Sequence, residues 1–173
     1  VGDARLLCRS VVNCAGLFAD RIADMVLGRD CADAAREKNG PPAIRRQPLR
    51  QYFAKGNYYR LEGQRCPFSR LVYPVPSGGG LGVHLTMDLA GNCRFGPDVE
   101  WIDMTLTDPD SINLIPDVVR ADGFYEEVRK YWPDLKDGCL APDYAGVRPK
   151  LGHPERTDGP SIRSDFLIEG PLQ

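Results

Sequence analysis

The stretch VVNCAGLFADRIADMVLG, residues 11–28, carries the strongest fold signal in this chain of 173 residues. It closes a nearly continuous apolar run over residues 6–14, which is typical of a parallel strand covered on both faces. Ala15 and Gly16 then allow a tight turn, and apolar residues recur near helical spacing over 17–27. The stretch predicts a strand, a turn and a helix in direct succession.

The turn between this strand and this helix is the first candidate site. A helix N-terminus offers unpaired backbone N–H groups and the positive end of the helix dipole to an anion such as a phosphate. Ala15, Gly16 and Leu17 are the residues whose backbone an anion would approach. An ordinary strand–helix junction explains the same residues, and the sequence leaves both interpretations open. The G-x-G-x-x-G fingerprint is absent, and the glycine run at 78–82 lies between two predicted strands and opens no helix.

Composition excludes several classes of function. The net charge of −2, with mixed signs throughout, argues against a protein that binds nucleic acid or acidic membranes in general. No run approaches 18 apolar residues, so no transmembrane segment is expected. The chain begins at Val1 and the predicted strand follows almost at once. We therefore expect a piece of a longer protein, without a targeting segment to read.

The six cysteines form no C-x-x-C pair and do not stand at zinc-site spacing from either histidine. We expect them to be free thiols in a reducing compartment and expect no metal site.

The rest of the chain predicts a different architecture. The patterns first predict a charged linker over 29–47 with a short helix at 31–38, and then an aromatic-rich strand from Pro48 with a bend at Gly56. An antiparallel meander follows over 70–97. The last elements are a helix over 123–132 ended by Pro133, and two strands around a polar loop with His153. A strand–helix unit followed by an antiparallel block indicates an α+β fold.

The second candidate site is LGVHLTMD, residues 81–88. Alternate residues of a strand share a face, so His84 and Thr86 lie together on a polar face, opposite an apolar face that includes Val83 and Leu85. A histidine on the wall of a polar cavity could accept a proton from a substrate hydroxyl. A solvated sheet face explains the pattern equally well.

Two further stretches carry candidate binding residues. In YAGVRPKL, Arg148 precedes a proline, so its backbone is extended, and a fixed arginine suits a carboxylate that accepts two hydrogen bonds. Lys150 shares its face, and a surface ion pair is the simpler alternative. In KGNYYRL, Tyr58 and Tyr59 point to opposite faces, so one can belong to the core while the other lines a pocket.

Taken together, these stretches resemble the L-2-hydroxyglutarate dehydrogenases, a branch of the FAD-dependent oxidoreductases of the D-amino-acid-oxidase type. The resemblance rests on VVNCAGLFADRIA, FAKGNYYRL, VYPVP followed by GGLGVHLT, RFGPDVEWID, YWPDL and DYAGVRPKL. It implies a partial Rossmann-like unit for FAD over 1–42, an antiparallel-sheet substrate domain with helices over 43–140, and return strands over 141–173. The N-terminal fingerprint of the family and its C-terminal flavin-binding segment are absent from this chain.

The resemblance also implies a chemistry. FAD accepts a hydride from C2 of L-2-hydroxyglutarate, 2-oxoglutarate forms, and the electrons pass to an unidentified acceptor. By position, it places His84 and Thr86 in the substrate cavity and Arg148 close to the flavin and a substrate carboxylate. Together with the strand patterns, this leads us to expect catalysis by His84 and Arg148, and substrate contacts from Thr86, Tyr58 and Lys150. The resemblance also places Ala15 and Gly16 near FAD, and we expect Leu17 and Gly146 to contact the cofactor as well.

Alternatives remain at this point. A flavin oxidoreductase of the same family could act on an amino acid or on glycerol 3-phosphate, because fold does not fix the substrate. A truncated fragment without catalysis, with an unpaired sheet edge and poor solubility, is the other alternative. The resemblance implies mitochondria if the source is a eukaryote, and otherwise a cytoplasmic or membrane-peripheral location.

Overall fold

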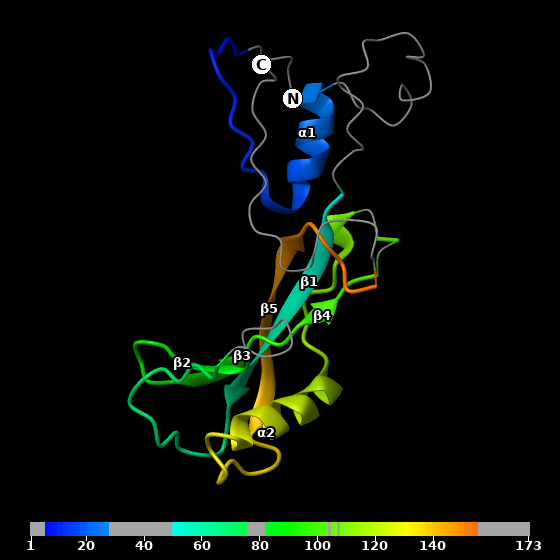
Figure 1. Ribbon diagram of the computed structural model, residues 1–173. Helices are drawn as coiled ribbons and strands as arrows, with labels where there is room; N and C mark the ends of the chain where they lie inside the picture. Colours follow the sequence, from blue (N-terminus) through cyan, green and yellow to red (C-terminus); the bar gives the residue numbers. More distant parts are fainter. Residues whose placement is uncertain (1–5, 28–49, 76–81, 104, 107, 156–173) are drawn as a thin grey trace. The chain divides into compact units, whose positions relative to one another are not determined.

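The computed structural model describes residues 6–27, 50–75, 82–103, 105–106 and 108–155 (Figure 1). The chain divides into two compact units, Val1–Arg50 and Gln51–Gln173. The predicted linker helix at 31–38, the glycine run at 78–81 and the second C-terminal strand lie outside the described residues. In the part of the chain that is described, no helix is long and apolar enough to cross a membrane.

The first unit contains the helix that the opening stretch predicts. A short 3-10 helix, η1 (Gly16–Phe18), leads directly into α1 (Ala19–Leu27). Asn13 fixes the turn before it, because its Nδ2 donates to the Ala19 carbonyl at 2.7 Å and its Oδ1 accepts from the Ala15 N–H at 3.2 Å. The side chain of Asn13 therefore ties the incoming chain to the start of α1.

The strand expected over residues 6–14 does not form, so this prediction is wrong for the structure. The backbone there forms no strand, and Leu6, Leu7, Val11 and Val12 are all exposed. A strand is stable only when neighbouring strands accept and donate its ladder hydrogen bonds. Among the described residues, no segment pairs with 6–14, so the apolar run has neither a partner strand nor a covering layer.

The second unit is built on an antiparallel sheet (Figure 1). Its strands are β1 (Tyr52–Leu61), β2 (His84–Met87), β3 (Cys93–Gly96), β4 (Glu100–Trp101) and β5 (Leu140–Lys150). β1 is central, with β5 paired along its length on one edge and β3 and β4 sharing the other; β2 lies beyond β3. The predicted meander is confirmed for β2 and β3, whereas its first segment contributes only the bridge between Val72 and Leu85.

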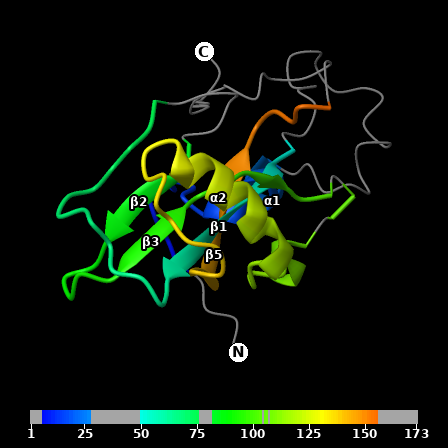
Figure 2. The same cartoon turned by 90° about the horizontal axis from the view of Figure 1, so that it is seen from below.

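One helix covers one face of this sheet, as the view from below shows (Figure 2). α2 (Ala121–Arg129) begins two residues before the predicted start and ends three residues before the predicted end. Two short 3-10 helices precede it, η3 (Pro109–Ser111) and η4 (Val118–Arg120). The carboxylate of Asp117 accepts a hydrogen bond from the Val119 N–H at 3.0 Å, which caps η4. The α+β class is therefore confirmed.

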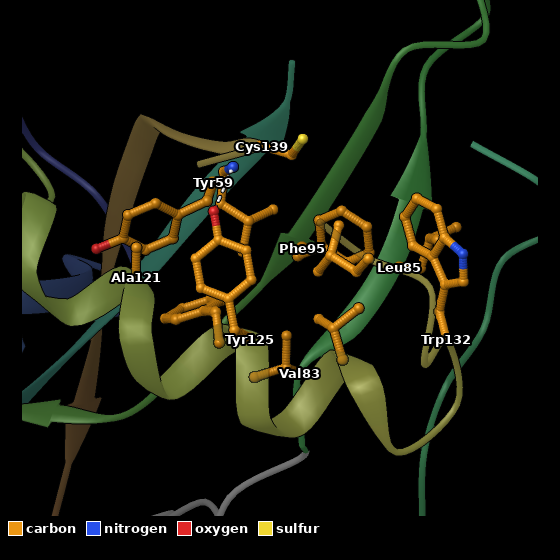
Figure 3. Close-up of a cluster of buried hydrophobic side chains, with 12 residues drawn as sticks. Tyr59, Val83, Leu85, Phe95, Ala121, Tyr125, Trp132 and Cys139 are labelled. Atoms are coloured by element: carbon orange, nitrogen blue, oxygen red, sulfur yellow. Dashed lines mark hydrogen bonds between the residues drawn. The ribbon is translucent and has the colours of Figure 1, made fainter. Parts of the chain in front are cut away.

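The core lies between α2 and the sheet (Figure 3). Tyr59, Leu85 and Phe95 come from β1, β2 and β3 and are fully buried. The ring of Tyr59 packs on Phe124 of α2, with the ring centroids 4.5 Å apart. Because alternate residues of a strand point to opposite faces, this packing leaves their neighbours in sequence on the face away from α2.

Candidate functional site

The face of the sheet away from α2, called here the open face, carries six of the nine candidate residues. Residues directly opposite each other in an antiparallel pair share a face. His84 lies opposite Gly96 and Thr86 opposite Arg94. Across β1 and β5, the opposed pairs are Gly56 with Gly146, Ala54 with Arg148, and Tyr52 with Lys150. Tyr58 joins the same face, so residues distant in sequence lie on one surface.

His84 is held at this surface by the core beneath it. Its neighbours Val83 and Leu85 are buried against α2, which fixes the position of β2 and turns the imidazole outward. The ring of Tyr73 stacks on the imidazole, with centroids 4.1 Å apart and 17° between the ring planes. The predicted division of residues 82–88 into an apolar and a polar face is therefore confirmed.

Tyr58 is half-buried on the open face. Its ring stacks on Tyr144 of β5, at 4.5 Å and 13° between planes. Gly96 makes room for the ring: its φ is +146°, and a Cβ there would lie 2.7 Å from Tyr58 Cδ1 and 2.6 Å from the Asn57 carbonyl oxygen. Burial raises the pKa of Tyr58, and Tyr144 adds to the rise, while Arg148 opposes it. The phenol is thus a proton-bearing hydrogen-bond donor at neutral pH.

A bare stretch of backbone lies next to this stacked pair. A Cβ added at Gly146 would meet no atom within 4 Å, whereas one at the opposed Gly56 would lie 2.7 Å from Pro97 Cβ. Gly146 is exposed, and it stands between Tyr144 and the exposed Arg148 on β5. A flat ligand could therefore approach the β5 backbone at Gly146, with aromatic rings on one side and a guanidinium on the other.

Thr86 shares the face but is already engaged. Its Oγ1 donates to the Arg94 carbonyl at 3.4 Å. The Arg94 guanidinium forms an ion pair with Asp143 and lies 3.7 Å from Asp88. The Asp143 hydrogen bond raises the pKa of Arg94, and hydrogen bonds from Asn92 lower the pKa of Asp88. This corner of the open face is an internally satisfied charge network.

At the other end, Lys150 lies opposite Tyr52 at the edge of the sheet. His153, expected in a polar loop, is instead buried: its ring lies 5.4 Å from that of Tyr52 and 4.8 Å from that of Trp101, centroid to centroid. The aromatic contacts close the end of the open face, so His153 is a packing residue there.

The opposite side of β1 holds a buried charge network. Asn57 is fully buried, and its backbone N–H and Nδ2 donate to Asp98 Oδ1 at 2.8 and 3.0 Å. Arg120 donates two hydrogen bonds to the other oxygen of Asp98. The buried Lys55 ammonium lies 3.5 Å from Glu100. This network joins the segment between β3 and β4 to β1, directly behind Tyr58.

The remaining three candidates belong to the first unit. At Gly16, φ is +56° and a Cβ would meet nothing within 4 Å. No side chain caps the start of η1. The Ala15 N–H is already bonded to Asn13 Oδ1. The open left-handed Gly16 leaves space beside the backbone of Gly16 and Leu17, which fits the approach of a phosphate. The donor chemistry of this turn is therefore compatible with a dinucleotide.

Sequence reasoning missed two residues of the open face, Tyr73 and Tyr144. Tyr144 could have been found, because it precedes Gly146 and Arg148 by two and four residues and so shares their face. Tyr73 could not, because its place beside His84 depends on the register between residues 71–75 and β2.

Comparisons with known proteins show the family of this chain. Residues 2–170 match the family described as FAD dependent oxidoreductase. The mitochondrial L-2-hydroxyglutarate dehydrogenase of Arabidopsis thaliana is 42% identical over 95% of this chain and 31% of that protein. The mitochondrial enzyme of the same name from Pongo abelii is 32% identical over 95% of this chain and 38% of its own length.

A glycerol 3-phosphate dehydrogenase from Caloramator mitchellensis is 34% identical over 92% of this chain and 26% of that protein. The chain thus spans about a third of the length of the curated relatives it matches. Because the family match covers nearly every residue, this chain belongs to the FAD dependent oxidoreductase family.

Proposed function

We propose that this chain is part of a dehydrogenase that oxidises L-2-hydroxyglutarate to 2-oxoglutarate with FAD. The observation that carries the proposal is the 42% identity, over 95% of the chain, to a plant protein named for that activity. The open face supports it, since it gathers an imidazole, a phenol and a guanidinium on one surface.

The substrate is a dicarboxylate with a hydroxyl group at C2, so it needs a proton acceptor and a cationic partner. A ring nitrogen of His84 accepts the hydroxyl proton as the carbonyl forms at C2. Arg148 binds a carboxylate through two parallel hydrogen bonds, while Lys150, Tyr58 and Thr86 contribute polar contacts. FAD, when bound, supplies the acceptor for the hydride that leaves C2.

Two groups of residues would contact the cofactor. The backbone of Ala15, Gly16 and Leu17 suits a phosphate, and the bare backbone of Gly146 suits a flat ring. In the same proposal, residues 1–42 belong to the FAD-binding domain, 43–140 to the substrate domain and 141–173 return toward the FAD-binding domain. The compact units divide nearby, after Arg50.

The direct test uses the full-length protein that contains this chain. The purified protein is mixed with L-2-hydroxyglutarate in the absence of oxygen, and its visible flavin spectrum is recorded. We expect the flavin band to bleach with the L enantiomer and to remain with the D enantiomer. A flavin that stays oxidised with both would overturn the proposed substrate, and a protein without flavin would overturn the proposed cofactor.

Glycerol 3-phosphate is a second candidate substrate, because a relative named for that activity is 34% identical to this chain. It also carries a secondary hydroxyl, but its anion is a phosphate instead of a carboxylate. Bleaching by glycerol 3-phosphate and not by L-2-hydroxyglutarate would favour this alternative.

We also infer where the protein acts. The plant and ape relatives are named as mitochondrial, which supports mitochondria if the source is a eukaryote, and a cytoplasmic or membrane-peripheral location otherwise. The partner we expect is a small 2-hydroxy acid, with an electron acceptor still to be identified and no nucleic acid. Immunoblotting of purified mitochondria for the full-length protein tests the location.

A further inference from the structure

We propose that Tyr73 is a positioning residue, which holds the imidazole of His84 in the orientation that accepts the substrate proton. The inference rests on the role proposed above for His84. It assigns a function to a residue to which the sequence patterns gave no role.

The backbone fixes Tyr73 opposite His84. Val72 and Leu85 exchange two backbone hydrogen bonds, of 3.1 Å from the Val72 N–H and 2.9 Å from the Leu85 N–H. In this antiparallel register the residue after Val72 faces the residue before Leu85. Tyr73 and His84 are therefore cross-strand neighbours on the open face.

A second contact fixes the same segment beyond Tyr73. Pro74 packs on Gly82, where an added Cβ would lie 2.8 Å from Pro74 Cγ. Tyr73 is thus held between a hydrogen-bonded bridge on one side and a close steric contact on the other. The position of its Cα relative to β2 does not depend on the ring itself.

Core packing does not explain where the ring lies. Tyr73 is 60% exposed, while Val72 beside it packs against the core. Instead the phenol lies nearly parallel to the imidazole, at 4.1 Å between centroids. Such pairs gain stacking energy beyond the area they bury.

The stack has a consequence for proton transfer. The torsion that turns an imidazole about its Cβ–Cγ bond is broad and weakly restricted in a free side chain. A parallel ring on one face of the imidazole narrows this torsion. The ring nitrogens form hydrogen bonds in the ring plane, which the stacked ring does not cover. Because proton transfer demands a short and aligned contact, narrowing this torsion favours the reactive orientation.

The test compares Tyr73→Ala with Tyr73→Phe in the full-length protein, by the rate of flavin reduction at saturating substrate. Tyr73→Ala should lower this rate about three- to tenfold, the range expected when a stacking interaction is lost, with KM little changed. Tyr73→Phe keeps the stack and should restore the rate. Val75→Ala, at an exposed position two residues on, is the matched control and should leave the rate unchanged. Equal rates in wild type and Tyr73→Ala would overturn the proposal.

A double variant separates positioning from a general structural effect. His84→Gln alone should slow flavin reduction roughly 10²- to 10⁴-fold. If Tyr73 acts through His84, adding Tyr73→Ala to His84→Gln should cause no further loss, because the two effects are coupled. A full multiplicative loss in the double variant would contradict the proposal.

The stack can also be measured without turnover. In protein with isotopically labelled histidine, the ring C–H signals of His84, assigned by their loss in His84→Gln, should move downfield in Tyr73→Ala and stay near the wild-type position in Tyr73→Phe. Signals that do not move would overturn the proposal. If these signals move but L-2-hydroxyglutarate fails to bleach the flavin, the stacking of Tyr73 on His84 is confirmed and the proposed substrate is wrong. The rate comparison is then made with glycerol 3-phosphate.

Discussion

Tyr58 and Tyr144 stack across β1 and β5, with ring centroids 4.5 Å apart and 13° between the ring planes. The pair lies where the register between the two strands shifts, between Asn57 and Tyr59. Gly56 and Gly146 are directly opposed one step further along; Pro97 covers Gly56, whereas the backbone at Gly146 is open. The stacked rings therefore border a bare stretch of backbone, which is where we expect a ligand to approach the sheet.

A side chain at Gly146 should prevent the flat ring of the cofactor from approaching the β5 backbone, without destabilising the fold. In the full-length protein, Gly146→Val places a side chain where a Cβ meets nothing within 4 Å, and valine suits a strand. We expect the thermal midpoint to change little, in line with about 0.5 kcal/mol for such surface changes. The rate of flavin reduction should fall roughly 10- to 100-fold, because small misplacements of reacting groups are costly. Gly123→Ala, at an open position in α2, is the control, and an unchanged rate in Gly146→Val would refute this role for the bare backbone.

Replacing the guanidinium should weaken substrate binding more than it slows the reaction. Arg148→Lys keeps the charge but loses the planar pair of donors. The apparent dissociation constant for L-2-hydroxyglutarate, from anaerobic titration of flavin reduction rates, should rise roughly 10- to 100-fold, the scale of a charge-assisted hydrogen bond. Arg65→Lys, at an exposed arginine in the second unit, should leave it unchanged. An Arg148→Lys protein of normal affinity would remove Arg148 from carboxylate binding.

The network behind Tyr58 should contribute strongly to stability. Asp98→Ala removes the acceptor for the Asn57 N–H and for Arg120. We expect a loss of about 2–3 kcal/mol, reduced from the value for a fully buried pair because Arg120 is partly exposed to solvent. Denaturant unfolding monitored by fluorescence measures it. The exposed pair of Lys130 and Glu127 gives the comparison, since Lys130→Ala should cost at most about 0.5 kcal/mol. If Asp98→Ala and Lys130→Ala lowered the free energy of unfolding by similar amounts, the Asp98 network would contribute no more than an exposed ion pair.

Stability should fall in alkaline solution. Burial raises the pKa of Tyr59 from 10.0 to about 12, and burial also raises the pKa of Tyr131. The folded state then holds these protons more tightly than the unfolded chain. Their contribution is complete below about pH 10 and is lost as the pH rises through the folded values. The thermal midpoint should therefore drop between pH 10 and 12, and less steeply in Tyr59→Phe. Parallel pH profiles for wild type and Tyr59→Phe would count against this cause.

Local pattern was sufficient for several parts of the fold. The helix over 19–27, the α2 helix and the two-faced strand around His84 follow from periodicity, because apolar spacing reports directly which side chains a segment can bury. The same rule separated Tyr59 from Tyr58, and the structure buries the first and leaves the second on the open face. Local pattern was wrong where the predicted element depends on a neighbouring strand. The apolar run at 6–14 predicts a strand, but a strand requires neighbouring strands, which the described residues do not supply.

The sequence by itself determined the α+β class, the positions of α1 and α2 among the described residues, and the set of side chains that shares a face with His84 and with Arg148. Only the tertiary structure decided which strands lie side by side, and hence that Tyr73 meets His84, that Tyr144 meets Tyr58, and that Gly96 leaves room for the Tyr58 ring. The physical reason is that periodicity depends on one segment alone. Register, in contrast, is set by hydrogen bonds and steric contacts between segments distant in sequence, and a shift of one residue would reverse every face.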